Sequence, residues 1–156
     1  MKIRRAELKD TDQISQLFYD TVTNINIKDY DSAQISVWAS GYNDIKKWSS
    51  KIQEQYFFVA EQDNKITGFG SITSEGYLDY MYVHKDHQGK GIASELLKYL
   101  VQIAFDHDLR EIRAEVSITA RPFFRSKGFE ITKTFITRLG EVEFEDCEMT
   151  KFLCKK

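Results

Sequence analysis

The stretch of sequence that decides the fold reads Val83-His84-Lys85-Asp86-His87-Gln88-Gly89-Lys90-Gly91-Ile92-Ala93. It joins a segment rich in strand formers to a long segment in which apolar residues recur at helical spacing. Gly89 and Gly91 therefore stand where a helix begins, and the first N–H groups of a helix have no partner inside it. At the positive end of the helix dipole, these groups can bind a phosphate through the main chain alone. The stretch predicts an anion site between a strand and a helix.

Three kinds of phosphate-binding loop compete for this stretch, and their spacing separates them. A Walker A loop needs Gly, four residues, and then Gly-Lys followed by Ser or Thr, which this sequence does not supply. The dinucleotide fingerprint would need a glycine at Ser94. Glu115 stands near the place of a ribose-binding acid, but too little chain follows for a doubly wound sheet. The third pattern has Arg or Gln, two residues, Gly, one residue, and then Gly or Ala. The residues from Gln88 to Ala93 match it.

The segments on either side of the loop have clear periodicity. The helix after Gly91 carries an apolar stripe that ends near His107 and consists of Ile92, Leu96, Leu97, Leu100, Val101 and Ala104. The strand before the loop runs from Gly76 to His84. A hairpin precedes that strand, with strands at 56–61 and 66–72 around the turn Asp63-Asn64-Lys65.

The two ends of the chain supply the remaining elements. Before the hairpin we expect a strand at 2–5, a helix capped by Asp10-Thr11-Asp12, and two short helices between 24 and 51 that meet at Ser40-Gly41. After the long helix we expect a strand at 111–116, a short helix at 120–126 ended by Gly128, and strands at 130–139 and 142–152. Antiparallel hairpins with one strand-helix-strand crossover predict a mixed α/β (α+β) fold.

The composition is that of one globular domain, residues 1–156. Of these residues 42% are apolar, and 11 Phe, 8 Tyr and 2 Trp can form a core without disulfides or metal. A net charge of −2 provides no basic stripe for a phosphate backbone. No window approaches the roughly 18 apolar residues of a membrane span. We therefore expect a cytoplasmic protein that binds neither nucleic acid nor membrane.

Residues with metal-binding chemistry lack the spacing of a metal site. Cys147 and Cys154 form no Cys-x-x-Cys pair, so we interpret them as ordinary thiols. His84, Asp86 and His87 are close in sequence but have no fourth ligand, which favours solvated loop residues. No metal is expected.

The loop pattern resembles that of the GNAT family of acetyl-CoA-dependent N-acetyltransferases, and the likeness extends beyond the loop. Asp79-Tyr80-Met81-Tyr82-Val83 resembles the family's fourth strand. Ala120-Arg121-Pro122-Phe123-Phe124-Arg125-Ser126-Lys127-Gly128-Phe129 resembles its fourth helix and the turn that follows, and Met149-Thr150-Lys151 resembles its last strand. With the order of elements, the resemblance covers the chain from Ile3 to Leu153.

The resemblance implies the GNAT-like acyl-CoA N-acyltransferase fold, a mixed sheet of about seven strands, splayed between strands 4 and 5 and flanked by about four helices. It also implies acetyl-CoA as co-substrate. Backbone groups around Met81, Tyr82 and Val83 would pair with the pantetheine, because a splayed gap leaves strand N–H and C=O groups unpaired. In the loop, Lys90 and Ser94 would add side-chain donors for the phosphates. The further residues expected to contact the coenzyme are those of the loop and of the facing strand and helix: Gln88, Gly89, Lys90, Gly91, Ile92, Ala93, Ser94, Ser117 and Phe124.

Acetyl transfer requires a neutral amine, so a base must accept a proton from the acceptor's ammonium. Asp79 is our first candidate, because it lies on the face of its strand where the family often presents an acid. Glu115 and His84 are alternatives. A different interpretation is that Asp79 only pairs with a surface lysine or arginine.

The group that protonates the departing thiolate is less clear from the pattern. Phe124 stands where the family commonly has a tyrosine, and Ser117 stands where it often has an asparagine. Tyr82, Ser117, Tyr80 or a water molecule can substitute, and a thiolate is a tolerable leaving group at neutral pH. Phe124 also fits a core position beside Phe123.

The acceptor is predicted to bind against the segment from Asn24 to Trp48, which the resemblance places on the acceptor side. Tyr30 and Trp38 are the candidate contacts, and aromatic and acidic residues together suit a cationic or amine-bearing molecule. Tryptophans in short helices are also common packing residues. We expect a small-molecule amine, with a peptide amine or lysine side chain as alternatives, and leave a homodimer open. A second hypothesis is a coenzyme A binding or sensing module with little turnover, suggested by Phe124 and Ser117.

Overall fold

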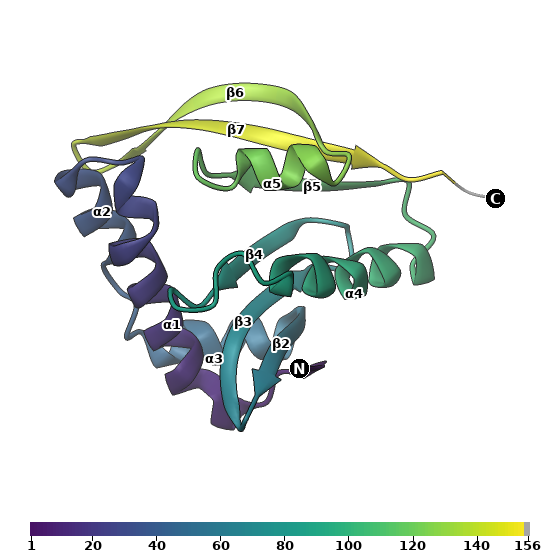
Figure 1. Cartoon of the computed structure of the whole chain (residues 1–156). Helices are drawn as coiled ribbons and strands as arrows, with labels where there is room; N and C mark the ends of the chain where they lie inside the picture. The colour runs from purple at the N-terminus through teal and green to yellow at the C-terminus, as the bar shows by residue number, and fades with distance from the viewer. Residues whose placement is uncertain (155–156) are drawn as a thin grey trace.

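The computed structural model describes residues 1–154 and contains two antiparallel sheets. The first has the order β1-β2-β3-β4 and consists of β1 (Lys2–Arg5), β2 (Tyr56–Gln62), β3 (Lys65–Ile72) and β4 (Leu78–Val83). The second has the order β5-β7-β6 and consists of β5 (Glu111–Val116), β6 (Glu130–Leu139) and β7 (Val142–Phe152). A parallel bridge between Tyr77 and Arg113 joins the sheets. Beyond it β4 and β5 diverge, which confirms the predicted splay (Figure 1).

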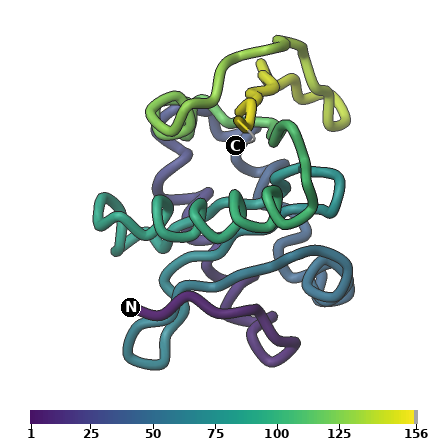
Figure 2. The backbone as a smooth tube through the Cα atoms, turned by 90° about the vertical axis from the view of Figure 1, so that its right-hand side faces the viewer, coloured from purple at the N-terminus to yellow at the C-terminus, as the bar shows by residue number. Residues whose placement is uncertain are grey.

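Helices cover both faces of the first sheet. One face carries α1 (Thr11–Asn24), α2 (Ser32–Ala39) and α3 (Ile45–Glu54), and the other carries α4 (Ile92–Asp106). The short α5 (Arg121–Ser126) packs beneath the second sheet, and α4 runs between the two sheets (Figures 1 and 2). The described residues thus hold five α-helices, with two short 3-10 helices, η1 (Leu8–Asp10) and η2 (Asn26–Lys28). The family resemblance implied about four helices, and the sequence pattern itself predicted the two short helices between 24 and 51.

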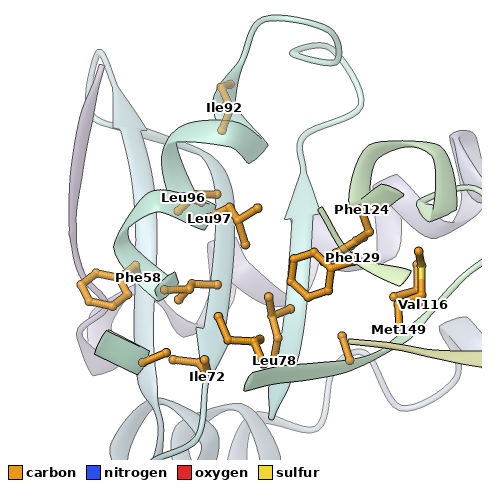
Figure 3. Packing of buried hydrophobic residues seen from close by; sticks show 14 of the residues in the cluster. Phe58, Ile72, Leu78, Ile92, Leu96, Leu97, Val116, Phe124, Phe129 and Met149 are labelled. Carbon is orange, nitrogen blue, oxygen red and sulfur yellow. The ribbon is translucent and has the colours of Figure 1, made fainter. Parts of the chain in front are cut away.

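Alternating side chains of β2 divide the interior into two cores. Phe57 and Val59 face α1 and α3, where Trp48 is fully buried. Phe58 and Ala60 face α4 on the other side of the sheet. Leu96 and Leu97 of α4 lie between Phe58 and Phe129, so the same helix also packs against the second sheet (Figure 3).

Two glycines of β3 let α4 approach the sheet closely. A Cβ on Gly68 would lie 2.8 Å from Cγ2 of Ile92, and one on Gly70 would lie 3.2 Å from Cδ1 of Leu100. Both values are at or below the closest ordinary contact, so a larger residue would push the helix outward. The start of α4 is therefore fixed by backbone-to-side-chain packing.

Two boundaries differ from the sequence-based expectation. Asp10 is the N-cap residue of α1, but its side chain does not cap the helix. Its carboxylate instead receives the Arg4 guanidinium, at 2.8 and 2.9 Å, and the backbone N–H of Glu7 at 2.8 Å. β4 begins at Leu78 rather than Gly76, because Gly76 has a φ of +94° and closes a turn to the Thr73 carbonyl at 3.1 Å.

Candidate functional site

A cavity of about 730 Å³ opens where β4 and β5 diverge. It is lined from α1, β4, the loop before α4, the start of α4, β5, α5, β6 and β7. Nearly all the residues singled out from the sequence lie along it: Tyr30, Trp38, Asp79, Met81, Tyr82, Val83, Gln88, Gly89, Gly91, Ile92, Ala93, Ser94, Ser117 and Phe124. Lys90, which is exposed, and the reserve candidates His84 and Tyr80 do not line the cavity.

The glycine loop presents main-chain N–H groups to this cavity. Gly89 and Gly91 have φ angles of +73° and +82°, which non-glycine residues rarely adopt. A Cβ at either position would meet nothing within 4 Å, so open space lies in front of the backbone. Gly91 caps α4 without a side chain, and the first bond along the helix runs from the N–H of Glu95 to the Gly91 carbonyl at 3.1 Å. The preceding N–H groups are free to bind an anion.

Hydrogen bonds to the end of β4 hold the loop in place. The Val83 carbonyl accepts from Nε2 of Gln88 at 2.7 Å and from Oγ1 of Thr21 at 2.9 Å. The N–H of His84 donates to the Thr67 carbonyl at 2.8 Å. The Gln88 side chain therefore anchors the loop to the end of β4, which Thr21 in turn joins to α1, and it leaves the loop's main chain to face the cavity.

The strand β4 offers an open backbone edge to the same cavity. It pairs with β3 on one side, and on the other side the described residues show only the strand bridge at Tyr77, just before β4, and the side-chain bonds to the Val83 carbonyl. Met81 and Val83 point to the cavity from this strand. Because buried backbone groups need partners, this edge can pair with a ligand that carries amide groups.

The carboxylate of Asp79 lies in the cavity wall but is not free. Its Oδ2 accepts a hydrogen bond from Nε2 of Gln55 at 2.7 Å and pairs with Nζ of Lys51 at 3.1 Å. Both partners come from α3 and the residue that follows it. The structure therefore contains the lysine pairing that was the alternative interpretation of Asp79, and both contacts are made through Oδ2.

Three groups with hydroxyl or aromatic character surround the middle of the cavity. Tyr82 lines it, and burial raises the pKa of its hydroxyl while a hydrogen bond from the Trp38 side chain opposes that shift. Ser117 accepts the N–H of Ala120 at 3.2 Å, which leaves its own proton available to a ligand. Phe124 is only 3% exposed and packs edge-on against Phe129 at 5.0 Å. Tyr80 does not line the cavity and packs against Trp48 instead.

The predicted acceptor side forms one wall of the cavity through two of its four aromatic residues. The Tyr30 hydroxyl accepts the N–H of Ile118 at 2.8 Å, and its ring packs edge-on against Trp38 at 5.1 Å. Trp48 is buried in the core, and Tyr42 lines a smaller, separate cavity. A second link, from Oγ1 of Thr119 to Asp29 at 2.7 Å, closes this wall against the loop after β5.

Sequence reasoning missed several polar residues in the cavity, among them Asp146 and Asn26. Asp146 is one of several charged residues in β7, so the sequence pattern did not distinguish it from its neighbours. Together with Glu115 and Asp79 it gives the cavity three carboxylates. Burial raises the pKa of Glu115, and the charges of Asp146, Glu148 and Asp79 add to the effect. Burial and the charges of Glu115 and Asp79 likewise raise the pKa of Tyr77 to about 12.

Residues 1–154 contain no group of three or more His, Cys, Asp or Glu side chains placed to hold a metal ion. Over the same residues, no helix has the length and apolar character needed to cross a bilayer.

Comparisons with known proteins agree with this geometry. A family model described as an acetyltransferase (GNAT) domain matches residues 26–144. The uncharacterized N-acetyltransferase YafP of Escherichia coli K12 is 32% identical over 133 residues, which cover 85% of this chain and 83% of that protein. A GCN5-related N-acetyltransferase from Rhodopseudomonas palustris has the same fold, with a TM-score of 0.93 at 22% identity over 97% of this chain and 95% of that one.

A further solved structure shares the fold and holds a ligand. It is the PaiA N-acetyltransferase of Thermoplasma acidophilum in complex with coenzyme A, with a TM-score of 0.81 at 19% identity, covering 97% of this chain and 98% of that one. The family match spans most of the chain, and it confirms the resemblance inferred from the glycine loop. The protein belongs to the GNAT family of acetyltransferases.

Proposed function

We propose that this GNAT acetyltransferase takes its acetyl group from acetyl-CoA and transfers it to a primary amine of a small molecule. The observation that carries the proposal is the cavity between β4 and β5, in which free main-chain N–H groups and carboxylates line the same space. The N–H groups suit a diphosphate, and the carboxylates suit an amine. The solved structure of PaiA, which has the same fold, contains coenzyme A.

The groups that line the cavity match the successive parts of acetyl-CoA in their chemistry and in their order along the cavity. The N–H groups from Gly89 to Ser94 would bind the diphosphate, since a Cβ at Gly89 or Gly91 would occupy the space in front of them. The open edge of β4 around Met81 and Val83 would pair with the amides of the pantetheine. Phe124 would contact the arm from the side of α5.

The reaction we propose is direct attack within a ternary complex. The neutral amine nitrogen attacks the thioester carbon, a C–N bond forms, the C–S bond breaks, and the sulfur leaves with the electron pair. The amine proton passes to Asp79 through Oδ1, because Lys51 and Gln55 hold the other oxygen in place. The thiolate takes a proton from solvent, either directly or through the hydroxyl of Tyr82 or Ser117, which solvent then reprotonates.

A small acceptor is favoured by the closed wall around Tyr30. The contacts of Tyr30 with Ile118 and of Asp29 with Thr119 join the acceptor side to the loop after β5. An amine on a short, flexible molecule can enter beside this wall, whereas a folded protein presenting a lysine would have to open it.

The proposed function is tested by calorimetric titration with acetyl-CoA and by an amine screen that follows free thiol. Binding together with thiol release that depends on an amine supports the enzyme. The second candidate, a coenzyme-sensing module, is favoured by one observation: Phe124 is buried where relatives place an acid. Tight coenzyme binding without release across a broad panel of amines would support the sensor and contradict the enzyme.

A further inference from the structure

We propose that Gln34 is a positioning residue of the acceptor site: it holds the hairpin of β6 and β7 in place, and thereby sets the shape of the cavity where the acceptor binds. This inference rests on the proposed function and deepens the account of the same site. The hairpin contributes Thr137, Leu139 and Phe144 to the cavity wall. The end of the hairpin lies beside α2, the helix that carries Gln34 (Figure 1).

The half of the hairpin that borders the cavity has a strand on one side only. β6 pairs with β7 from its first residue, whereas β5 pairs with β7 only from Cys147 to Phe152. Between Val142 and Asp146 the other edge of β7 therefore has no strand beside it among the described residues, and its backbone groups need partners. Every residue of β6 is exposed or half-buried, so packing of β6 in a core does not fix this half either.

Two side chains take the place of the missing strand. Nε2 of Gln34 donates to the Glu143 carbonyl at 2.9 Å. Nη2 of Arg121, in α5, donates to the Glu145 carbonyl at 3.3 Å. The bond from Gln34 is the shorter one, and within residues 1–154 no other hydrogen bond joins α2 to the second sheet. Because Phe144 stands between the two carbonyls, these bonds fix the residue that closes the cavity.

The start of α2 orients the Gln34 side chain. Its Oε1 accepts the N–H of Asp31 at 2.9 Å, while the Asp31 carboxylate accepts the N–H of Gln34 at 2.8 Å, which is a reciprocal capping box. Since Oε1 is held in this way, Nε2 is left to reach β7. The two ends of one amide group thus have separate roles, one in the helix and one at the hairpin.

The contact that Gln34 secures belongs to the acceptor side of the cavity. Phe144 is buried with its ring 6.1 Å from that of Tyr30, and Tyr30 packs edge-on against Trp38. All three line the cavity. The groups that we assign to the coenzyme come from β4, the glycine loop and α5, none of which is hydrogen-bonded to Gln34. Loss of the Gln34 bond should therefore free the hairpin and weaken acceptor binding, but leave coenzyme binding unchanged.

Gln34→Glu separates the two roles of this side chain. A glutamate oxygen can still accept the Asp31 N–H, and glutamate is favoured both at this position of a capping box and near a helix N-terminus, so α2 keeps its start. A carboxylate cannot donate to the Glu143 carbonyl, so the hairpin loses its bond. Gln16→Glu is the matched control, because Nε2 of Gln16 also donates a bond of 2.9 Å, to Asp20 on α1, outside the cavity.

The first measurement needs neither coenzyme nor acceptor. Acrylamide quenching of tryptophan fluorescence reports on Trp38 in the cavity wall, because the other tryptophan of the chain, Trp48, is fully buried. We expect Gln34→Glu to raise the quenching constant, and Gln16→Glu to keep the wild-type value. Unchanged quenching in Gln34→Glu would show that the bond does not hold the hairpin, and would overturn the positioning role.

The second measurement is thiol release with saturating acetyl-CoA and varied concentrations of the best primary amine of the screen described above. Gln34→Glu should raise the KM for the amine about 2- to 10-fold, the effect of one hydrogen bond, with kcat and the calorimetric affinity for acetyl-CoA unchanged. An unchanged KM, or an equal loss of coenzyme affinity, would overturn the role at the acceptor site. Raised quenching without thiol release from any amine would support the hold of Gln34 on the hairpin and contradict the proposed function.

Discussion

Replacing Gly91 by alanine should weaken acetyl-CoA binding much more than it weakens the fold. Gly91 has a φ of +82° and no heavy atom within 4 Å of an added Cβ, so the free protein acquires backbone strain but no clash. That strain is about 1 to 2 kcal/mol for an L-residue in the left-handed region. In the complex, the methyl group would stand in front of the N–H groups that start α4. Loss of one charged hydrogen bond corresponds to roughly 10- to 100-fold weaker binding.

The chain offers a matched control in Gly41. Its φ is +75°, a Cβ there would also meet nothing within 4 Å, and it lies outside the main cavity. Gly41→Ala should therefore lose the same stability in urea denaturation and keep the affinity for acetyl-CoA measured by calorimetry. Unchanged affinity in Gly91→Ala would refute the assignment of the loop. An equal loss of acetyl-CoA affinity in both variants would show that the loss comes from reduced stability of the fold and not from the loop itself.

Three other substitutions test separate parts of the reasoning. Asp79→Asn should slow acetyl transfer far more at pH 7 than near pH 9.5, because the amine loses its proton unaided at the higher pH. An equal loss of rate at both pH values would show that Asp79 is not the base. Arg4→Met leaves Asp10 buried without its cation and should cost about 3 kcal/mol at pH 7 in urea denaturation. The hydrogen bonds of Asp10 outweigh its burial and lower its pKa, so this difference should shrink as the pH falls through that lowered pKa, and a pH-independent loss would contradict it. Phe124→Tyr should change kcat little, because Tyr82 and Ser117 already present hydroxyls, whereas a gain of about 10²-fold would show that the native chain lacks an acid.

The fold could be predicted wherever the information is local. The stripe from Ile92 to Ala104, the glycines before it and the hairpin at 63–65 each follow from a few neighbouring residues, and the structure confirms all three. The helices between 24 and 54 were harder, because they are short and give the sequence pattern only a few turns to act on. The partners of Asp79 could not be predicted, since Lys51 and Gln55 come from an element that only the folded chain brings near.

The polar residues that line the cavity divide in the same way. Gln88 and the glycines belong to a motif, so their positions were visible in the sequence. Asn26 follows a helix with no pattern around it, and it stands out only because the structure buries it without a partner for Oδ1. Asp146 is one of several acids on β7, and only the pairing of β5 with β7 shows that it shares a face with Glu148, opposite Glu115.

The position of the cavity follows from how α4 packs on the first sheet. Gly68 and Gly70 allow the helix to lie against β3, and Ile92 makes the closest of these contacts. Because Ile92 is the first residue of α4, the contact that secures the core also sets the place of the free N–H groups beside β4. With α4 also packed against Phe129, the second sheet meets β4 only at the Tyr77 bridge. The free N–H groups at the start of α4 and the open edge of β4 therefore line one cavity as consequences of one packing arrangement.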